Sequence, residues 1–317
     1  MSAEYLGIVW NPSKTSKDDL AAALEDALDG AAPPRVSWFE TTVEDPGRGQ
    51  ARSALAAGVD VVIAAGGDGT VRAVAEVLAE ADRPVSLAIV PMGTGNLLAR
   101  NLEVPLPAAE ALGIALSGHE RSVDLAWAHT HIDGDDVRLA FTVMAGMGID
   151  AHMITETDED LKGKVGWLAY VESLGRAVAA SDVVDLQVVT DGGQPESERA
   201  HTIIVGNCGI LTGGVVLLPD ADPADGELDM LILSADGVGG WLDTLRSMVW
   251  DNGLKRVVGA TDEAESSASV DHRRVRSVSV ELSEPRVLEL DGDDVGECVR
   301  VEFSVQPEAL RVRSPQQ

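Results

Sequence analysis

Residues 60–70 place the strongest constraint on the fold of this chain. The run Asp60–Ala65 is almost entirely apolar and ends in the glycine turn Gly66-Gly67-Asp68-Gly69-Thr70. A short apolar run of this kind is typical of a strand that is buried on both faces of a parallel sheet. Apolar residues recur at helical spacing after the turn, so the pattern predicts a strand, a glycine turn and a helix.

A turn of this composition can bind phosphate. Phosphate oxygens need several backbone N–H groups close together at a helix N-terminus, and glycine lets the chain approach without a Cβ in the way. The candidate residues are Gly66, Gly67, Asp68, Gly69 and Thr70. The alternative interpretation is a tight left-handed turn in which Thr70 only caps the helix.

A second glycine turn ends the next predicted strand, Val85–Val90. Its sequence is Pro91-Met92-Gly93-Thr94-Gly95-Asn96, and a helix is predicted from Leu97 to Leu102. Neighbouring parallel strands bring such turns side by side at their carboxyl ends, where α/β sheets bind ligands. The two turns together predict a nucleotide-phosphate site.

The rest of the first third alternates strand and helix patterns. Strands are predicted at Leu6–Trp10 and Val36–Phe39, one helix after Ser16, and another from Pro107 to Leu116. Aromatic residues make up only 3% of the chain, so the core must be built mainly from Ala, Val, Leu and Ile, which suits buried parallel strands. These observations predict a doubly wound α/β domain.

From about residue 122 the pattern changes to period two with turn signals, which is typical of antiparallel strands. The predicted strands are 122–128, 137–144, 185–190, 200–205, 228–233, 275–282, 286–290, 298–305 and 309–312. The first four form two predicted hairpins, and the whole region is predicted to be a mostly antiparallel β-sandwich. The expected domains are 1–127, which the strand 306–317 can complete, and 128–305.

Two helices, Leu161–Ala180 and Gly240–Trp250, are predicted to interrupt the sandwich, and 260–269 is predicted to be an exposed loop. The apolar faces of these helices either pack in the core or contact a lipid surface. The densest basic run, His272–Arg276, either contacts phospholipid headgroups or forms the solvated edge of a strand.

The formal net charge of −29 argues against nucleic acid as a partner, because binding its backbone needs a basic face. It also repels an anionic membrane unless a local basic cluster faces the lipid, and it equally fits a generally acidic, salt-adapted proteome. Cys208 and Cys298 lack the spacing of a disulfide framework or zinc site, and no apolar run approaches a membrane span. We expect a cytoplasmic protein with at most peripheral membrane contact.

Several motifs together resemble the diacylglycerol kinase catalytic domain family, which includes bacterial lipid kinases and sphingosine kinases. Asn11-Pro12, Gly66–Thr70 and Pro91–Asn96 match in order and spacing. The likeness extends over almost the whole chain, through Val123-Asp124, Gly166–Tyr170, Gly206-Asn207, Leu218–Ala221, Asp225-Gly226 and Asp291-Gly292. The resemblance implies an NAD-kinase-like or diacylglycerol-kinase-like fold and transfer of the ATP γ-phosphoryl group to a lipid hydroxyl.

The resemblance also implies roles for single residues. The two glycine turns would hold the nucleotide phosphates, with Asn11 and Thr42 lining the same cleft. Asp68 and Asp124 would belong to a water-mediated Mg²⁺ network, which suits the preference of Mg²⁺ for carboxylates, water and phosphate oxygens. The alternative for Asp124 is a solvated strand end.

A structural Mg²⁺ loop is implied at Leu217, through its carbonyl, with Asp220 and Asp222. Asp225 begins the Asp-Gly turn that follows and completes the predicted metal group. Clustered aspartates also form ordinary solvated turns, which is the alternative here.

Two positions depart from the family pattern. The family commonly has Asp-Gly-Glu where this chain has Asp291-Gly292-Asp293, so Asp293 is the expected general base, one methylene shorter than glutamate. Asp294 and Glu297 are nearby substitutes. Many bacterial members also have Asn-Asp where this chain has Asn96-Leu97, which would remove one acidic member of the Mg²⁺ network.

The leading hypothesis is therefore an ATP- and Mg²⁺-dependent lipid kinase acting on diacylglycerol or a sphingoid-like alcohol. An NAD kinase or phosphofructokinase shares the Gly-Gly-Asp-Gly signature but not the second turn. The changes at Leu97 and Asp293 instead suggest a lipid- or nucleotide-binding protein with little kinase activity. Exposed strand edges would allow a homodimer.

Overall fold

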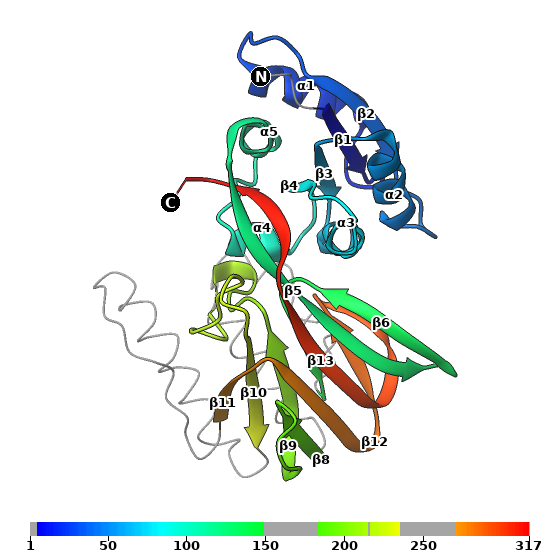
Figure 1. Ribbon diagram of the computed structural model, residues 1–317, viewed down its shortest axis with the longest axis vertical. Helices are drawn as coiled ribbons and strands as arrows, with labels where there is room; N and C mark the ends of the chain where they lie inside the picture. Colours follow the sequence, from blue (N-terminus) through cyan, green and yellow to red (C-terminus); the bar gives the residue numbers. More distant parts are fainter. Residues whose placement is uncertain (1–4, 149–182, 215, 235–269, 317) are drawn as a thin grey trace, which may run out of the picture. The chain divides into compact units, whose positions relative to one another are not determined.

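The computed structural model describes residues 5–148, 183–214, 216–234 and 270–316 (Figure 1). The chain divides into a first unit, Met1–Leu125 with Gln306–Gln317, and a second unit, Ala126–Val305. Two long strands, β5 (His119–Ile132) and β13 (Asp293–Ser314), have residues in both units. The two interrupting helices and the loop predicted from the sequence lie outside the described residues.

The first unit contains a parallel sheet of four consecutive strands. These are β1 (Tyr5–Trp10), β2 (Arg35–Glu40), β3 (Val61–Gly66) and β4 (Ser86–Pro91). Their order is β4-β3-β1-β2, and the last part of β13 adds a parallel strand beside β4. Every residue of β3 and β4 is buried, as expected for strands covered on both faces.

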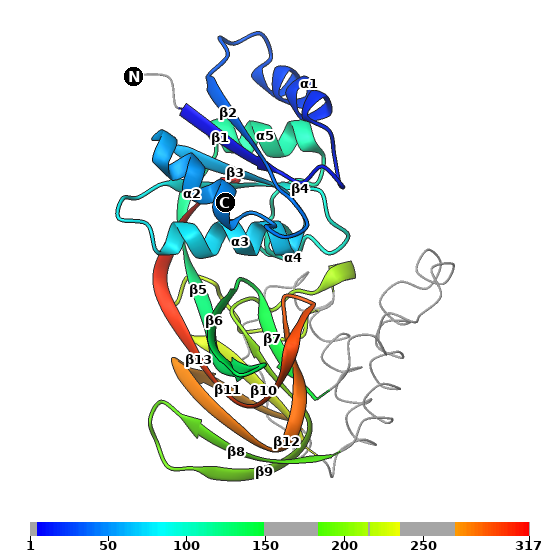
Figure 2. The same cartoon turned by 90° about the vertical axis from the view of Figure 1, so that its right-hand side faces the viewer.

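Helices cover both faces of this sheet (Figure 2). They are α1 (Lys17–Leu28), α2 (Arg48–Ala57), α3 (Asp68–Ala79), α4 (Leu97–Asn101) and α5 (Ala108–Ser117). α1 packs against α5 on one face, and α2 packs against α3 on the other. The predicted cap of the first helix is confirmed, because the Ser16 side chain accepts a hydrogen bond from the N–H of Asp19.

The helix α2 is not among the helices predicted from the sequence. No Ser, Thr, Asp or Asn stands at its N-cap, which is Gly47. Asp45, two residues before the N-cap, caps the helix instead. Its carboxylate accepts hydrogen bonds from the N–H groups of Gly47 and Gly49. Only two alanines of the helix, Ala51 and Ala54, are buried, so its apolar face is weak in the sequence.

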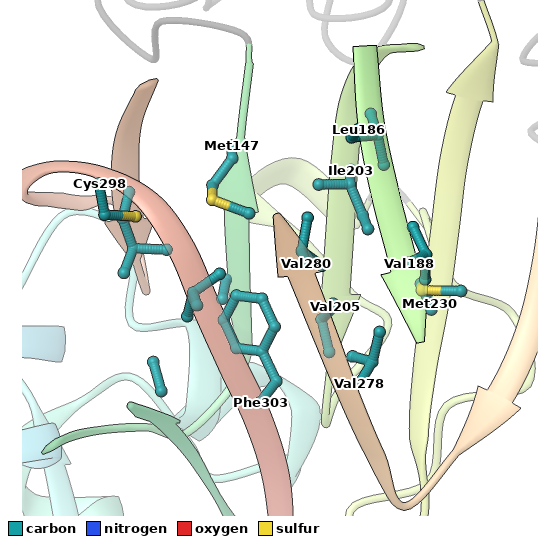
Figure 3. Close-up of a cluster of buried hydrophobic side chains, with 14 of the residues drawn as sticks. Met147, Leu186, Val188, Ile203, Val205, Met230, Val278, Val280, Cys298 and Phe303 are labelled. Atoms are coloured by element: carbon teal, nitrogen blue, oxygen red, sulfur yellow. The ribbon is translucent and has the colours of Figure 1, made fainter. Parts of the chain in front are cut away.

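The second unit is built from antiparallel strands. Besides β5 and β13 they are β6 (Asp135–Phe141), β7 (Met144–Met147), β8 (Val184–Thr190), β9 (Glu196–Gly206), β10 (Leu228–Ser234), β11 (Val270–Val275) and β12 (Ser277–Leu290). β12 pairs with β7, β8 and β13, while β9 pairs with β7, β8 and β10. Their inward side chains form a hydrophobic core that is mostly aliphatic (Figure 3). Within it, the rings of Phe141 and Phe303 meet edge to face with their centroids 5.9 Å apart.

Strand boundaries differ from expectation in three places. The predicted strand 137–144 is two strands, β6 and β7, separated by a bend at Thr142 and Val143. Conversely, 286–290 continues the strand that begins at Ser277, and 298–312 is one strand, β13. Period-two patterning cannot tell whether a strand ends or only contains a bulge. The strands that pair with it determine this, and they lie far away in the sequence.

Candidate functional site: two joined glycine turns

The two glycine turns lie side by side at the carboxyl ends of β3 and β4. Gly66 and Pro91 are paired in the sheet, and the N–H of Met92 donates to the carbonyl oxygen of Gly66 at 2.9 Å. A Cβ added to Gly93 would lie 2.7 Å from the Cα of Gly67. Glycine is therefore required at position 93 because the two backbones approach so closely.

The Asp68 carboxylate joins the turns directly. Asp68 is the first residue of α3, and its Oδ2 and Oδ1 accept hydrogen bonds from the N–H groups of Asn96 at 2.9 Å and Leu97 at 2.6 Å. Asn96 is the N-cap of α4 and has a φ of 50°. A carboxylate in this place accepts hydrogen bonds from N–H groups at a helix start, which have no partner within the helix. The positive end of the helix dipole also stabilises its negative charge.

The side chain of Asn96 closes the second turn on itself. Its Oδ1 accepts from the N–H of Gly93 and its Nδ2 donates to the carbonyl oxygen of Gly93, both at 2.8 Å. Arg100 adds a bond from its Nε to the carbonyl oxygen of Gly95, also at 2.8 Å. These bonds fix the conformation of the turn, and Thr94 is exposed at its tip.

Asn11 and Thr42 lie at the same carboxyl edge, after β1 and β2. The Asn11 Oδ1 accepts hydrogen bonds from the backbone N–H and the hydroxyl of Ser13, at 2.9 and 2.8 Å. The Thr42 Oγ1 accepts from the N–H of Asp45 at 3.1 Å. All the predicted nucleotide-binding residues therefore belong to one edge of the first unit, where their side chains shape the loops.

Thr41 is a residue at this edge that sequence analysis missed. It is 2% exposed, and its N–H donates to the carbonyl oxygen of Trp10 at 2.9 Å. Its Oγ1 has no hydrogen-bond partner among the described residues. No motif marks this threonine, because only its burial in the folded sheet distinguishes it from Thr42.

Asp124 is 1% exposed, so its alternative interpretation as a solvated strand end is wrong. Its Oδ1 accepts a hydrogen bond from the N–H of Glu308 at 2.7 Å, within the first unit. Leu97, where many family members have aspartate, is 8% exposed and supplies no side-chain oxygen. The carboxylates of Asp68 and Asp124 thus both accept hydrogen bonds from backbone N–H groups.

In the second unit, Asp291 and Gly292 form the two-residue turn between β12 and β13, with φ angles of 52° and 88°. Asp291 is 5% exposed, and its carboxylate accepts hydrogen bonds from the bend at Thr142. Asp293 follows the turn and is exposed. Of its two acidic neighbours, Asp294 accepts from the N–H of Gly296 at 2.9 Å and Glu297 is exposed.

The predicted metal loop is only partly suited to a cation. Leu217 is buried, and its N–H donates to the carbonyl oxygen of Gly209 at 2.8 Å. Asp225 instead forms an ion pair with Arg274. Among the described residues, no three His, Cys, Asp or Glu side chains gather so as to hold a metal ion, and this includes Asp220 and Asp222.

The basic run His272–Arg276 lies on β11 except for Arg276, which follows it, and β11 is the strand at one end of the second unit's strand order. Arg273 pairs with Glu196 at 2.8 Å and with Asp271 at 2.7 Å, and Arg274 pairs with Glu227 at 3.1 Å. Burial raises the pKa of Asp229, on the neighbouring strand, to about 6, against the attraction of Arg274. The arginines of this run are therefore matched by carboxylates of the same unit.

The first unit is a parallel sheet with helices on both faces and two glycine turns at its carboxyl edge, and the second is a β-sandwich. This combination is that of a kinase-like two-domain protein. Residues 6–128 match the diacylglycerol kinase catalytic domain, and residues 142–314 match the YegS C-terminal NAD kinase beta sandwich-like domain. These matches confirm the predicted fold class.

The chain is 34% identical over 282 residues to a protein of Pseudomonas aeruginosa (strain UCBPP-PA14) named "Probable lipid kinase YegS-like", covering 89% of this chain and 84% of that one. A protein of the same name from Pseudomonas putida is 28% identical over 313 residues, covering 97% and 94%. The crystal structure of a diacylglycerol kinase from Bacillus anthracis str. Sterne matches the fold with a TM-score of 0.68 at 22% identity, covering 99% and 98%. The chain belongs to the diacylglycerol kinase family, among the YegS-like lipid kinases.

Proposed function

We propose that this protein transfers the γ-phosphoryl group of ATP to a hydroxyl of diacylglycerol or of a sphingoid-like lipid. The observation that carries the proposal is the pair of glycine turns, joined through Asp68, in a chain of a lipid kinase family. Positioning and charge stabilisation provide most of the catalysis of phosphoryl transfer, and a rigid set of backbone N–H groups supplies both.

In this proposal, the first unit binds the nucleotide. A helix N-terminus can bind phosphate because its first N–H groups lack partners four residues earlier. In α3, the N–H of Thr70 donates to the carbonyl oxygen of Gly67 at 3.0 Å, and the start of the helix lies at the edge where phosphate would bind. Gly66–Thr70 and Gly93–Asn96 surround the phosphates, and Asn11 and Thr42 lie beside them on the same edge. Thr41 adds a buried hydroxyl there.

Mg²⁺ is the cofactor that this chemistry calls for. Mg²⁺ usually keeps several waters and binds through one or two carboxylates together with substrate phosphates, so it does not need a cluster of three side chains. Asp68 and Asp124 are the proposed carboxylates, because a carboxylate that holds an N–H group still has acceptor capacity. The ion would neutralise charge on the phosphates.

A second, structural Mg²⁺ would use the Leu217 carbonyl with Asp220 and Asp222. Asp225 fits this group less well, because Arg274 already supplies its counter-charge. We therefore assign Asp225 to the ion pair.

Asp293 is the proposed general base. Its carboxylate would accept the proton of the lipid hydroxyl as the oxygen attacks the γ-phosphorus, and ADP would leave with the pair of electrons of the broken bond. Asp293 is exposed and therefore accessible to a lipid hydroxyl. The lipid would be reached by peripheral contact with a membrane. None of the described helices is long and apolar enough to cross one.

The test is transfer of label from γ-labelled ATP to a panel of lipids in mixed micelles with Mg²⁺. We expect the wild type to label at least one lipid, Asp68→Ala and Asp293→Ala to lose at least about 100-fold in kcat, and Asp293→Glu to retain activity. Glu302→Ala, which removes an exposed carboxylate from the same strand as Asp293, is the matched control.

Transfer that survives Asp293→Ala would rule out the general-base role. ATP binding without transfer to any lipid would favour the second candidate, a nucleotide- or lipid-binding protein, which the changes at Leu97 and Asp293 suggest. In a parallel assay with NAD as the acceptor, label appearing in NADP but in no lipid would indicate an NAD-kinase-like enzyme.

A further inference from the structure

The turn that precedes the proposed base is held by a distant part of the chain. The Asp291 carboxylate accepts four hydrogen bonds from the bend at residues 142–144. Three come from the backbone N–H groups of Thr142, Val143 and Met144, at 2.9, 2.8 and 3.1 Å, and one comes from the Thr142 hydroxyl at 3.0 Å. The N–H of Asp291 returns a bond to the Met144 carbonyl oxygen at 2.8 Å.

The bend is in turn held by a third segment. The Asn207 Nδ2 donates to the carbonyl oxygen of Thr142 at 3.1 Å, and its backbone N–H donates to the carbonyl oxygen of Val143 at 2.8 Å. Thr142 and Asn207 are 3% and 1% exposed. Three segments separated by more than sixty residues thus form a single buried polar network, which we call the Asp291 clamp: Thr142–Met144, Asn207 and Asp291.

The clamp determines where Asp293 lies. The tip of a two-residue hairpin is normally free to fray, because beyond the turn it has no neighbour to pack against. Here Asp291 is anchored by five hydrogen bonds, and Asp293 is paired with Leu290 across the same turn. A misplacement of a catalytic group by about 1 Å can cost about 100-fold in rate.

We propose that Thr142 and Asn207 are positioning residues, which act through Asp291 to hold the Asp293 carboxylate at the acceptor hydroxyl. This inference rests on the proposed function. It assigns a role in kcat to two residues that carry no reactive group. It also explains the aspartate at the first position of the Asp-Gly turn, because its carboxylate anchors the turn to the bend at 142–144.

The test compares Thr142→Val with Thr202→Val. Both substitutions remove a buried threonine hydroxyl of similar exposure, since Thr202 is 6% exposed and donates to the Met147 carbonyl oxygen at 2.8 Å. Of the two threonine hydroxyls, that of Thr142 donates to Asp291, whereas that of Thr202 donates to Met147. We expect Thr142→Val to lower kcat about 10-fold with the KM for ATP unchanged, Thr142→Ser to restore it to within about twofold, and Thr202→Val to leave kcat at the wild-type value.

Two further variants keep the test decisive. Asn207→Ala removes the donor to the Thr142 carbonyl oxygen and leaves the Thr142 hydroxyl that donates to Asp291 in the chain. It should lower kcat in the same way, so it tests the clamp even if the Thr142→Val protein does not fold. On the Asp293→Ala background, Thr142→Val should cause no further loss, because a positioning residue has nothing left to position.

The outcomes separate the two proposals. No transfer by the wild type would overturn both. Transfer by the wild type with equal kcat in Thr142→Val and Thr202→Val, or an additive loss on the Asp293→Ala background, would overturn the positioning role alone.

Discussion

Two aspartates of the family motifs, Asp68 and Asp291, have structural roles that the motifs do not reveal. Asp68 holds the N–H groups of Asn96 and Leu97, and Asp291 holds those of the bend at 142–144. A carboxylate that accepts backbone N–H groups forms charge-assisted hydrogen bonds, which are stronger than neutral ones. Each aspartate therefore fixes the backbone around it, whatever further role it has towards a ligand.

At this scale the glycine turns allow a direct test with Gly93→Ala. Because the new Cβ would lie 2.7 Å from the Cα of Gly67, one turn must move, and we expect the affinity for ATP to fall at least about 10-fold. Gly113→Ala is the control: this glycine lies inside α5 and a Cβ there meets nothing within 4 Å, so stability should rise by about 0.5–1 kcal/mol. Titration with a fluorescent ATP analogue and thermal melting measure the two effects, and unchanged affinity in Gly93→Ala would refute the close-approach argument.

Among the elements, neighbouring strands β10 and β11 carry an unusual charge arrangement. Asp229 is 7% exposed, and burial raises its pKa from 3.8 to about 6. Arg274 opposes this shift, while Asp225, Asp220 and Glu227 add to it. The folded protein therefore holds a proton on Asp229 at pH values where the unfolded chain has already released it.

The sign of the pH dependence follows from linkage. A carboxyl group whose pKa is higher in the folded state contributes stability that is complete below about pH 4 and is lost as the pH rises through about 6. Asp229→Asn removes the titration, so its melting temperature should exceed that of the wild type by a few °C at pH 7.5 and by much less at pH 5. Melting curves in buffers with EDTA measure this, with the exposed Asp185, as Asp185→Asn, for comparison. A difference independent of pH would contradict the assignment.

For the whole molecule, the net charge of −29 is the dominant property. Arginines 273, 274 and 276 on and beside β11 pair with carboxylates of the same unit, so they leave little unbalanced positive charge for an anionic bilayer. The excess negative charge repels itself, and salt screens this repulsion.

Stability should consequently rise with ionic strength. The Debye length falls from about 30 Å at 0.01 M to about 8 Å at 0.15 M, so we expect the melting temperature to increase by several °C over this range of NaCl. Sucrose at equal osmolality separates screening from exclusion effects. A melting temperature that falls with salt would show that ion pairs outweigh net repulsion.

Local patterns were enough to predict much of the fold. The apolar run of β3, the glycine turns and the Ser16 cap each involve residues close in sequence, and period-two patterning marked most strands of the second unit. The family resemblance came from the same short motifs and is confirmed by the family matches.

The sequence by itself thus determined the class of fold, the order of most elements and the family. Only the tertiary structure decided that Asp68 joins the two turns, and that Asp291, Thr142 and Asn207 form one clamp. The physical reason is the range of the interactions. Hydrophobic period and glycine content act between near neighbours, whereas a buried carboxylate takes its N–H partners from whichever segment the fold places beside it.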